Sequence, residues 1–142
     1  MKRVLFSLAF VGVHALVVGA CAKKEDPTLC AHCHMKIAPT DPFRTTLVRS
    51  SGKTSSYDSL VCALGPDYSI DVKSTRVIEY YSGVERDANE LVFVQGSDVA
   101  SPMPDDWVPV DKANAKKFET DHGMTREVGF DQLVATVHGR LK

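Results

Sequence analysis

Short hydrophobic runs, separated by polar and turn-forming residues, follow one another along the chain from Phe43 onward. Runs rich in β-branched and aromatic residues predict strands, and runs that follow a capping Ser or Asp predict helices. We expect strands at 43–48, 54–57, 76–81, 91–94, 107–110 and 126–128, and helices at 60–64, 112–122 and 131–134. This order of strands, helix, strands and helix predicts an α+β fold in which two small units share one compact body.

The expected helix ends are marked by residues that cap helices. Asp58 and Ser59 precede the first helix, Asp111 precedes the second, and Asp131 opens the third. Their side chains can accept hydrogen bonds from the free N–H groups of a first helical turn. Gly123 is expected to end the second helix, because glycine adopts the left-handed conformation of a helix C-cap without strain.

The amino-terminal segment has the pattern of a secretory signal. A basic start, Met1-Lys2-Arg3, leads into an apolar run at 4–18 and then into Gly19-Ala20-Cys21. The run is too short for a spanning helix. Its end resembles a bacterial lipobox, in which the cysteine is diacylated and becomes the first mature residue. An ordinary cleaved signal with an incidental cysteine is the alternative.

This pattern predicts how the chain is divided. We expect a lipoprotein signal peptide at 1–20, a lipidated tether at 21–29 that begins at Cys21, and a metal-binding domain at 30–142. Two acyl chains anchor a protein stably, whereas one does not. The expected location is the bacterial cell envelope, lipid-anchored and facing the periplasm, on the outer membrane where the cell has one.

The charge balance limits the kinds of partner. The chain has 17 Lys and Arg against 18 Asp and Glu, for a net charge of −1. Loss of Lys2 and Arg3 with the signal leaves the mature form more acidic still. Nucleic acid binding needs a basic face, so no nucleic acid partner is expected. Attachment to a membrane through basic residues is equally disfavoured, which leaves the lipid anchor.

Two chemistries compete for the segment from Cys30 to Met35. Cys30, Cys33 and His34 form the C-x-x-C-H pattern of covalent haem c, in which both sulfurs form thioethers and the histidine is an axial ligand. Cys62, Met103 or Met35 would supply the distal ligand. The alternative is Cu(I), since Cys33 and Met35 are soft sulfur donors that an extended segment would point to one side.

A Cu(I) site of low coordination needs one further donor. Met103 is the expected third ligand, because a methionine between two prolines on a polar loop has no evident packing role. Cys30, His34 and His122 are second choices. Gap filling by Met103 and a helix-end role for His122 remain the structural alternatives. With Cys21 acylated, three cysteines remain, and at least one thiol must stay unpaired or bind something.

From Leu29 onward the chain resembles the NosL family, copper-binding lipoproteins that help to mature nitrous oxide reductase. The resemblance rests on several motifs in the family's order. They are Cys30-x-x-Cys33-x-Met35, Tyr57-Asp58-Ser59 with Cys62, Gly96-Ser97-Asp98-Val99, Pro102-Met103, Asp121-His122-Gly123 and Phe130-Asp131. At the position of His34 the family usually has glycine.

The resemblance implies two ββαβ-like units, Cu(I) carriage, and delivery to a copper-enzyme maturation machinery at the membrane. The alternative is a monohaem c-type cytochrome on the same scaffold, acting in electron transfer or gas binding. A lipoprotein that only binds other proteins is a third reading. The chain has no Gly-rich phosphate loop and no evident nucleophile–base pair, so we do not expect an enzyme.

Overall fold

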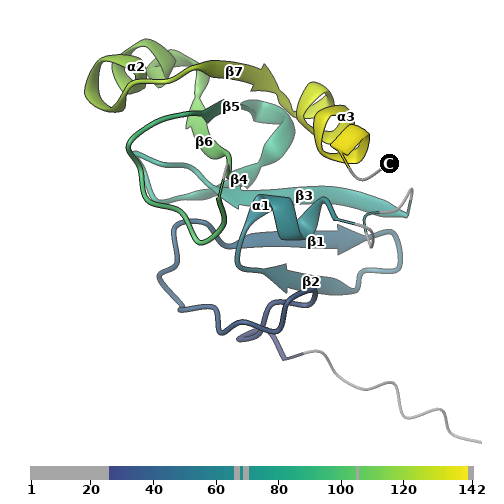
Figure 1. The fold of residues 1–142 in the computed structure, drawn as a ribbon. Coiled ribbons are helices and arrows are strands. Elements are labelled where there is room, and N and C mark those ends of the chain that lie inside the picture. Colours follow the sequence, from purple (N-terminus) through teal and green to yellow (C-terminus); the bar gives the residue numbers. More distant parts are fainter. Residues whose placement is uncertain (1–25, 66–67, 69–70, 105, 141–142) are drawn as a thin grey trace, which may run out of the picture.

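The computed structural model describes residues 26–140 apart from 66–67, 69–70 and 105 (Figure 1). The expected signal peptide, Cys21 and most of the tether therefore lie outside the described residues. The elements in chain order are β1 (Thr45–Arg49), β2 (Thr54–Tyr57), α1 (Leu60–Ala63), β3 (Val72–Ile78), β4 (Glu85–Asp87), the 3₁₀ turn η1 (Ala88–Glu90), β5 (Leu91–Gln95), β6 (Val108–Asp111), the 3₁₀ turn η2 (Lys112–Asn114), α2 (Ala115–His122), β7 (Arg126–Gly129) and α3 (Phe130–Arg140).

The first unit is an antiparallel sheet of order β2-β1-β3-β4 with α1 packed on one face (Figure 1). Side chains on strands alternate between the two faces, and the inward positions here are occupied by buried residues such as Leu47, Tyr57 and Val77. Leu47 lies opposite Ser55 of β2 and Thr75 of β3. The strand β4 was not predicted, because it is a short polar edge strand held to β3 by backbone pairing.

The single-turn helix α1 begins where the sequence predicts. Ser59 is its N-cap, and its hydroxyl accepts a hydrogen bond of 3.1 Å from the N–H of Cys62. Within the helix, Leu60, Cys62 and Ala63 are buried. The cap therefore fixes Cys62 on the inner side of the turn, with Asp58 just before the helix.

The second unit is an antiparallel sheet of order β6-β5-β7 with α2 and α3. Asp111 caps the expected helix, but its first turn is the 3₁₀ turn η2 and the α-helix begins at Ala115. Gly123 ends α2 with a φ of 69°, as predicted. The last helix α3 extends to Arg140, well beyond the expected end at Val134, and Asp131 lies in its first turn.

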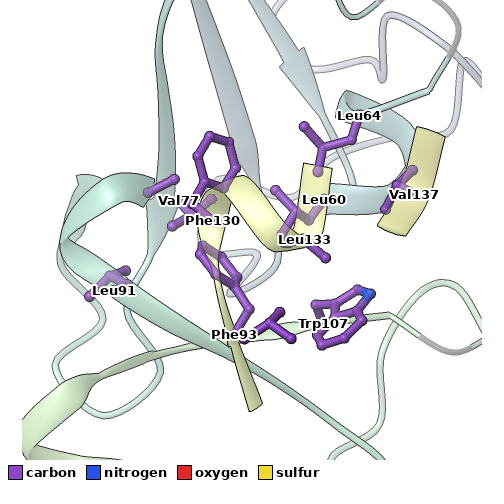
Figure 2. Close-up of a cluster of buried hydrophobic side chains, with 11 residues drawn as sticks. Leu60, Leu64, Val77, Leu91, Phe93, Trp107, Phe130, Leu133 and Val137 are labelled. Atoms are coloured by element: carbon purple, nitrogen blue, oxygen red, sulfur yellow. The ribbon is translucent and has the colours of Figure 1, made fainter. Parts of the chain in front are cut away.

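One hydrophobic core joins the two units. Leu60 and Leu64 of the first unit pack in the same cluster as Phe93, Trp107 and the inner face of α3 (Figure 2). The remaining members of the cluster are Val77, Ala88, Leu91, Val128, Phe130, Leu133 and Val137. The prediction of two small α+β units in one compact body is confirmed.

A buried carboxylate also ties the units together. Glu79 follows β3 and is only 2% exposed. It accepts hydrogen bonds from the N–H of Ser82 at 2.7 Å and from the N–H of Asp111, in the second unit, at 3.1 Å. Although burial acts in the opposite direction, these bonds hold the pKa of Glu79 below its usual value. Within the described residues no helix is both long and apolar enough to cross a membrane.

Candidate metal centre

The segment that carries the cysteine motif is a tight loop docked on the edge of the first sheet. Leu29 and Lys36 form an isolated antiparallel bridge, and the N–H of Cys30 donates to the carbonyl of Met35 at 2.8 Å. The N–H of Ala31 donates to the carbonyl of Ser56 in β2, also at 2.8 Å. The loop is thus closed on itself and attached to the sheet.

His34 occupies a left-handed position in this loop. Its φ is 62°, and its N–H donates to the carbonyl of Cys30 at 3.0 Å. This is the backbone arrangement in which helical turns usually end at a glycine. Among other residues, Asn, Asp and His are enriched in this conformation. The glycine expected from the NosL resemblance therefore has a conformational reason, and His34 can replace it at a modest cost.

The left-handed residue also corrects one expectation about the copper motif. Cys33 and Met35 were expected on an extended segment that points both side chains to one side. The chain instead turns between them, at His34, so they do not lie on an extended segment. The side chain of Met35 is 46% exposed.

Four possible metal donors converge beneath this loop. The sulfur atoms of Cys30, Cys33 and Cys62 and a carboxylate oxygen of Asp58 all lie within 4.8 Å of one another. Cys33 is exposed, whereas the other three residues are buried. A metal that forms bonds of about 2.3 Å to sulfur holds its donors at most about 4.6 Å apart, so small side-chain movements would close this group around an ion.

The donors interact with one another before any metal is bound. The thiol of Cys33 donates to Oδ2 of Asp58 at 3.4 Å. The other carboxylate oxygen of Asp58, Oδ1, is buried without a hydrogen-bond partner. A buried oxygen without a partner is destabilising, and a bound cation is one way to satisfy a carboxylate in such a place.

Burial favours the protonated form of the Cys33 and Cys62 thiols. It is the main cause that raises the pKa of Cys33, and the neighbouring Cys30 and Asp58 raise it further, whereas the N–H of Met35 opposes the shift. Burial likewise raises the pKa of the Cys62 thiol, although the hydrogen bond with Ser59 opposes it. A metal must therefore displace protons from these sulfurs as it binds.

The loop between β5 and β6 is fastened to α1 by Asp106. This residue is 6% exposed, and its carboxylate accepts hydrogen bonds from the N–H groups of Trp107, at 2.9 Å, and of Val61 in α1. Burial raises the pKa of Asp106 to about 7, with repulsion from Asp58 and Asp41 as lesser causes. Its Oδ2 is buried without a hydrogen-bond partner.

Met103 lies on this same loop and is half-buried. Its carbonyl accepts from the hydroxyl of Ser101 at 2.7 Å and from the N–H of Asp106 at 3.3 Å. The turn that carries Met103 is therefore tied, through Asp106, to the helix that carries Cys62. A role for Met35 and Met103 as thioether ligands stays a prediction.

His122 lies in the second unit, at the end of α2. Its Nε2 is 3.0 Å from the hydroxyl of Tyr80, and its Nδ1 is 2.8 Å from Oδ1 of Asp98. The N–H of Asp98 also donates to the carbonyl of His122. Nδ1 thus holds the start of the β5–β6 loop against α2, and Nε2 contacts the segment that follows β3. A metal would have to displace one of these contacts.

The cysteines of the haem pattern differ in accessibility. Cys30 is fully buried in a hydrophobic cluster with Ile37, Leu47 and Tyr57, and Cys62 packs in the same cluster. Covalent haem c needs both Cys30 and Cys33 to reach the porphyrin. The geometry gives no support to haem attachment, because the loop would first have to open around Cys30.

The sequence did not lead us to predict Asp58 as a metal donor, and it suggested Cys62 only as a haem ligand or a buried packing residue. A signal was present, because Asp58 and Cys62 are four residues apart across a helix start. The residue before an N-cap often packs against the fourth residue of the helix, so it lies close to the first helical turn. A carboxylate and a cysteine in that relation, in a chain with a C-x-x-C motif elsewhere, could have indicated a shared site.

No family model and no curated protein matches the chain. Among solved structures, it is similar to the crystal structure of the copper chaperone NosL from Shewanella denitrificans, with a TM-score of 0.61 and 23% sequence identity. The similarity covers 75% of this chain and 90% of that chain. The chain has a NosL-like fold, in agreement with the resemblance of its motifs.

Proposed function

We propose that the protein binds one Cu(I) ion at the cluster of cysteine thiols and delivers it for the assembly of a copper enzyme similar to nitrous oxide reductase. The observation that carries the proposal is the convergence of Cys30, Cys33, Cys62 and Asp58. The likeness to a structure titled as a copper chaperone supports it. The role proposed is that of a carrier and not of an enzyme.

The donor chemistry favours Cu(I) over harder ions. Three of the four convergent donors are sulfur, and thiolates prefer soft ions such as Cu(I). We assign Cys33 as the donor that first meets the ion, because it alone of the four is exposed. Met35 and Met103 are the proposed thioether donors, and the buried Cys30 and Cys62 are the thiols available behind Cys33.

The exposure of Cys33 also suits release. A partner can replace the donors one at a time if the first of them is accessible, and an ion with few ligands exchanges quickly. The buried Asp58 is a harder donor, so it would hold Cu(I) weakly and serve mainly to accept the proton or hydrogen bond of Cys33. Uptake and release can then proceed through one face of the loop.

The proposed location follows from the amino-terminal pattern. Diacylation of Cys21 would anchor the chain at the envelope with the metal centre on the periplasmic side. Cys21 and Cys30 are nine positions apart in the sequence, so an extended tether spans at most about 30 Å. The partner that receives the ion would therefore have to work close to the membrane, as a membrane-associated maturation machinery does.

Anaerobic competition with a chromogenic Cu(I) chelator tests the binding. The wild-type chain should bind one Cu(I), and Cys33→Ser should weaken binding at least about tenfold, because the loss of even an outer-shell partner of a metal ligand typically costs about 10–100-fold in affinity. Asp58→Asn and the matched exposed variant Asp26→Asn separate the buried carboxylate from a general charge effect. Met35→Leu and Met103→Leu test the thioether donors.

Three outcomes would overturn the proposal. One is tighter binding of Zn²⁺ than of Cu(I) in the same competition, since a Cys₃Asp set also suits zinc. Another is a Cu(I) affinity unchanged by Cys33→Ser and by Cys62→Ser. A third is a red protein with a Soret band that survives denaturation after expression beside haem-maturation enzymes, which would establish covalent haem.

A further inference from the structure

Two of the clustered thiols lie at the ends of one turn. The N–H of His34 donates to the carbonyl of Cys30, which places Cys30 and Cys33 at the first and fourth positions of that turn. This turn spans five residues, like one turn of an α-helix, in which α-carbons three residues apart lie about 5 Å from each other. Disulfides join α-carbons about 4.4–6.8 Å apart, so this turn is within reach of a bond between the two sulfurs.

Cys30 is a better partner for Cys33 than Cys62 is. The sulfur atoms of Cys30 and Cys33 lie within 4.8 Å of each other and belong to the same short loop. Cys62 belongs to α1 and is held there by the hydrogen bond that its N–H donates to Ser59. A bond from Cys33 to Cys62 would have to move the loop relative to the helix, whereas one to Cys30 rearranges a single turn.

Cys30 and Cys33 are free thiols in this structure. We propose that oxidation of the metal-free protein joins them in a redox-active disulfide, and that a dithiol reductant must open it before the site can take up a metal. In formation, the exposed Cys33 thiolate attacks a disulfide oxidant and releases one thiolate from it. Cys30 then attacks the mixed disulfide at Cys33 and releases the second thiolate. Two electrons pass from the two cysteines to the oxidant, and their two protons go to the released thiolates.

Reduction reverses these steps with a defined direction. Only the sulfur of Cys33 is accessible, so a dithiol attacks there and Cys30 leaves as the buried thiol. The second thiol of the reductant then resolves the mixed disulfide and leaves as the reductant's own disulfide. The partner is therefore a protein with a paired thiol motif and a surface that fits the loop around Cys33, or a small dithiol of the same chemistry.

The consequence for metal loading rests on the proposed function. The disulfide withdraws two of the four convergent donors, and Cys62 and Asp58 alone make a poor site for Cu(I). Exported proteins meet an oxidising environment, in which neighbouring thiols pair. Loading of this site would then be preceded by a dithiol–disulfide exchange reaction, and a bound Cu(I) would protect both thiols from oxidation.

Redox titration of the full metal-free chain tests the inference directly. The protein is equilibrated in glutathione buffers of increasing oxidised fraction, quenched in acid, alkylated and digested with trypsin. Cys30 and Cys33 fall in one tryptic peptide, 25–36, whereas Cys62 falls in 54–73 and Cys21 in 4–23. We expect peptide 25–36 to lose both alkylation sites together and to become lighter by two hydrogens, while 54–73 stays alkylated.

Matched variants extend the same map. Cys62→Ser should leave the oxidation of peptide 25–36 unchanged, and Cys30→Ser should leave Cys33 as a mixed disulfide with glutathione. Either of two results with the wild-type chain would by itself overturn the inference. One is a cross-link between peptides 25–36 and 54–73, and the other is full alkylation of peptide 25–36 at every buffer composition. Reduction of the oxidised chain with dithiothreitol should restore Cu(I) binding. If the oxidised chain binds Cu(I) as well as the reduced one, this inference fails but the proposed function does not. Oxidation as expected, with no Cu(I) binding after reduction, would sink the proposed function and leave the disulfide standing.

Discussion

Replacement of Asp106 by asparagine should flatten the pH dependence of stability. The wild-type carboxyl is almost fully buried, with two backbone N–H donors, one oxygen without a partner, and two other carboxyl groups, those of Asp58 and Asp41, near enough to repel it. Its pKa of about 7 in the folded chain compares with 3.8 for the ordinary group. The folded protein therefore binds this proton more tightly than the unfolded chain does.

The direction and size of the effect follow from that difference. A group with a raised pKa stabilises the fold fully below its unfolded value, and this stability is lost as the pH rises through the folded pKa. Between pH 5 and pH 8 the loss amounts to about 2.5 kcal/mol, at 1.36 kcal/mol for each pKa unit. Asparagine stays neutral throughout, so Asp106→Asn should remove this part of the slope and be the more stable form at pH 8.

Urea unfolding of the metal-free, reduced protein measures the effect. The only tryptophan, Trp107, is buried beside Asp106, so its fluorescence reports the transition. The comparison of wild type with Asp106→Asn at pH 5 and at pH 8 cancels all other titrating groups. Asp26→Asn, at an exposed site, should follow the wild type. Parallel stability curves for wild type and Asp106→Asn over this range would refute the reasoning.

Three further predictions concern the backbone and the joint between the units, and each is measured as an unfolding free energy. His34→Gly should keep Cu(I) binding and stability, because it relieves the left-handed conformation, whereas His34→Val should cost about 1–2 kcal/mol; equal stabilities would contradict the conformational role. Gly96→Ala should lower the unfolding free energy by more than about 2 kcal/mol, since the added Cβ would lie 2.1 Å from Oγ1 of Thr125. At Gly52 an added Cβ would meet no atom within 4 Å, so Gly52→Ala should show only the strain of the positive φ. Similar costs at both positions would argue against the clash. Glu79→Gln should lower the unfolding free energy by about 1–3 kcal/mol at pH 7. The difference from wild type should shrink as the pH falls below 4.5, because the stability that comes from a lowered carboxyl pKa is lost there. A cost independent of pH would contradict a stabilising role for the charge of Glu79.

Local patterns predicted most of the fold. The strand 54–57 and the Ser59 cap agree with the structure, because alternation and capping depend on neighbours in the chain. Long-range effects explain the differences. The strand β4 exists through its pairing with β3, and α3 extends past Val134 because Val137 buries against the shared core.

The site was predicted in part for the same reason. Cys30 and Cys33 share one loop, so the spacing of the motif alone predicts that they lie close together. Asp58 and Cys62 reach the same place only because β2 and α1 carry them there, and that placement depends on the docking of the loop on β2 through Ala31. Sequence spacing contains no direct record of such a contact.

The left-handed residue in the cysteine loop has a consequence for how genomes are surveyed for cytochromes. The backbone at this position accepts glycine and a few other residues, histidine among them. A histidine that fits this conformation completes the C-x-x-C-H pattern whether or not haem is attached. The pentapeptide alone therefore does not distinguish haem attachment from this loop conformation. In this chain three further residues accompany the pattern: Met35 directly after the histidine, and Asp58 four residues before Cys62.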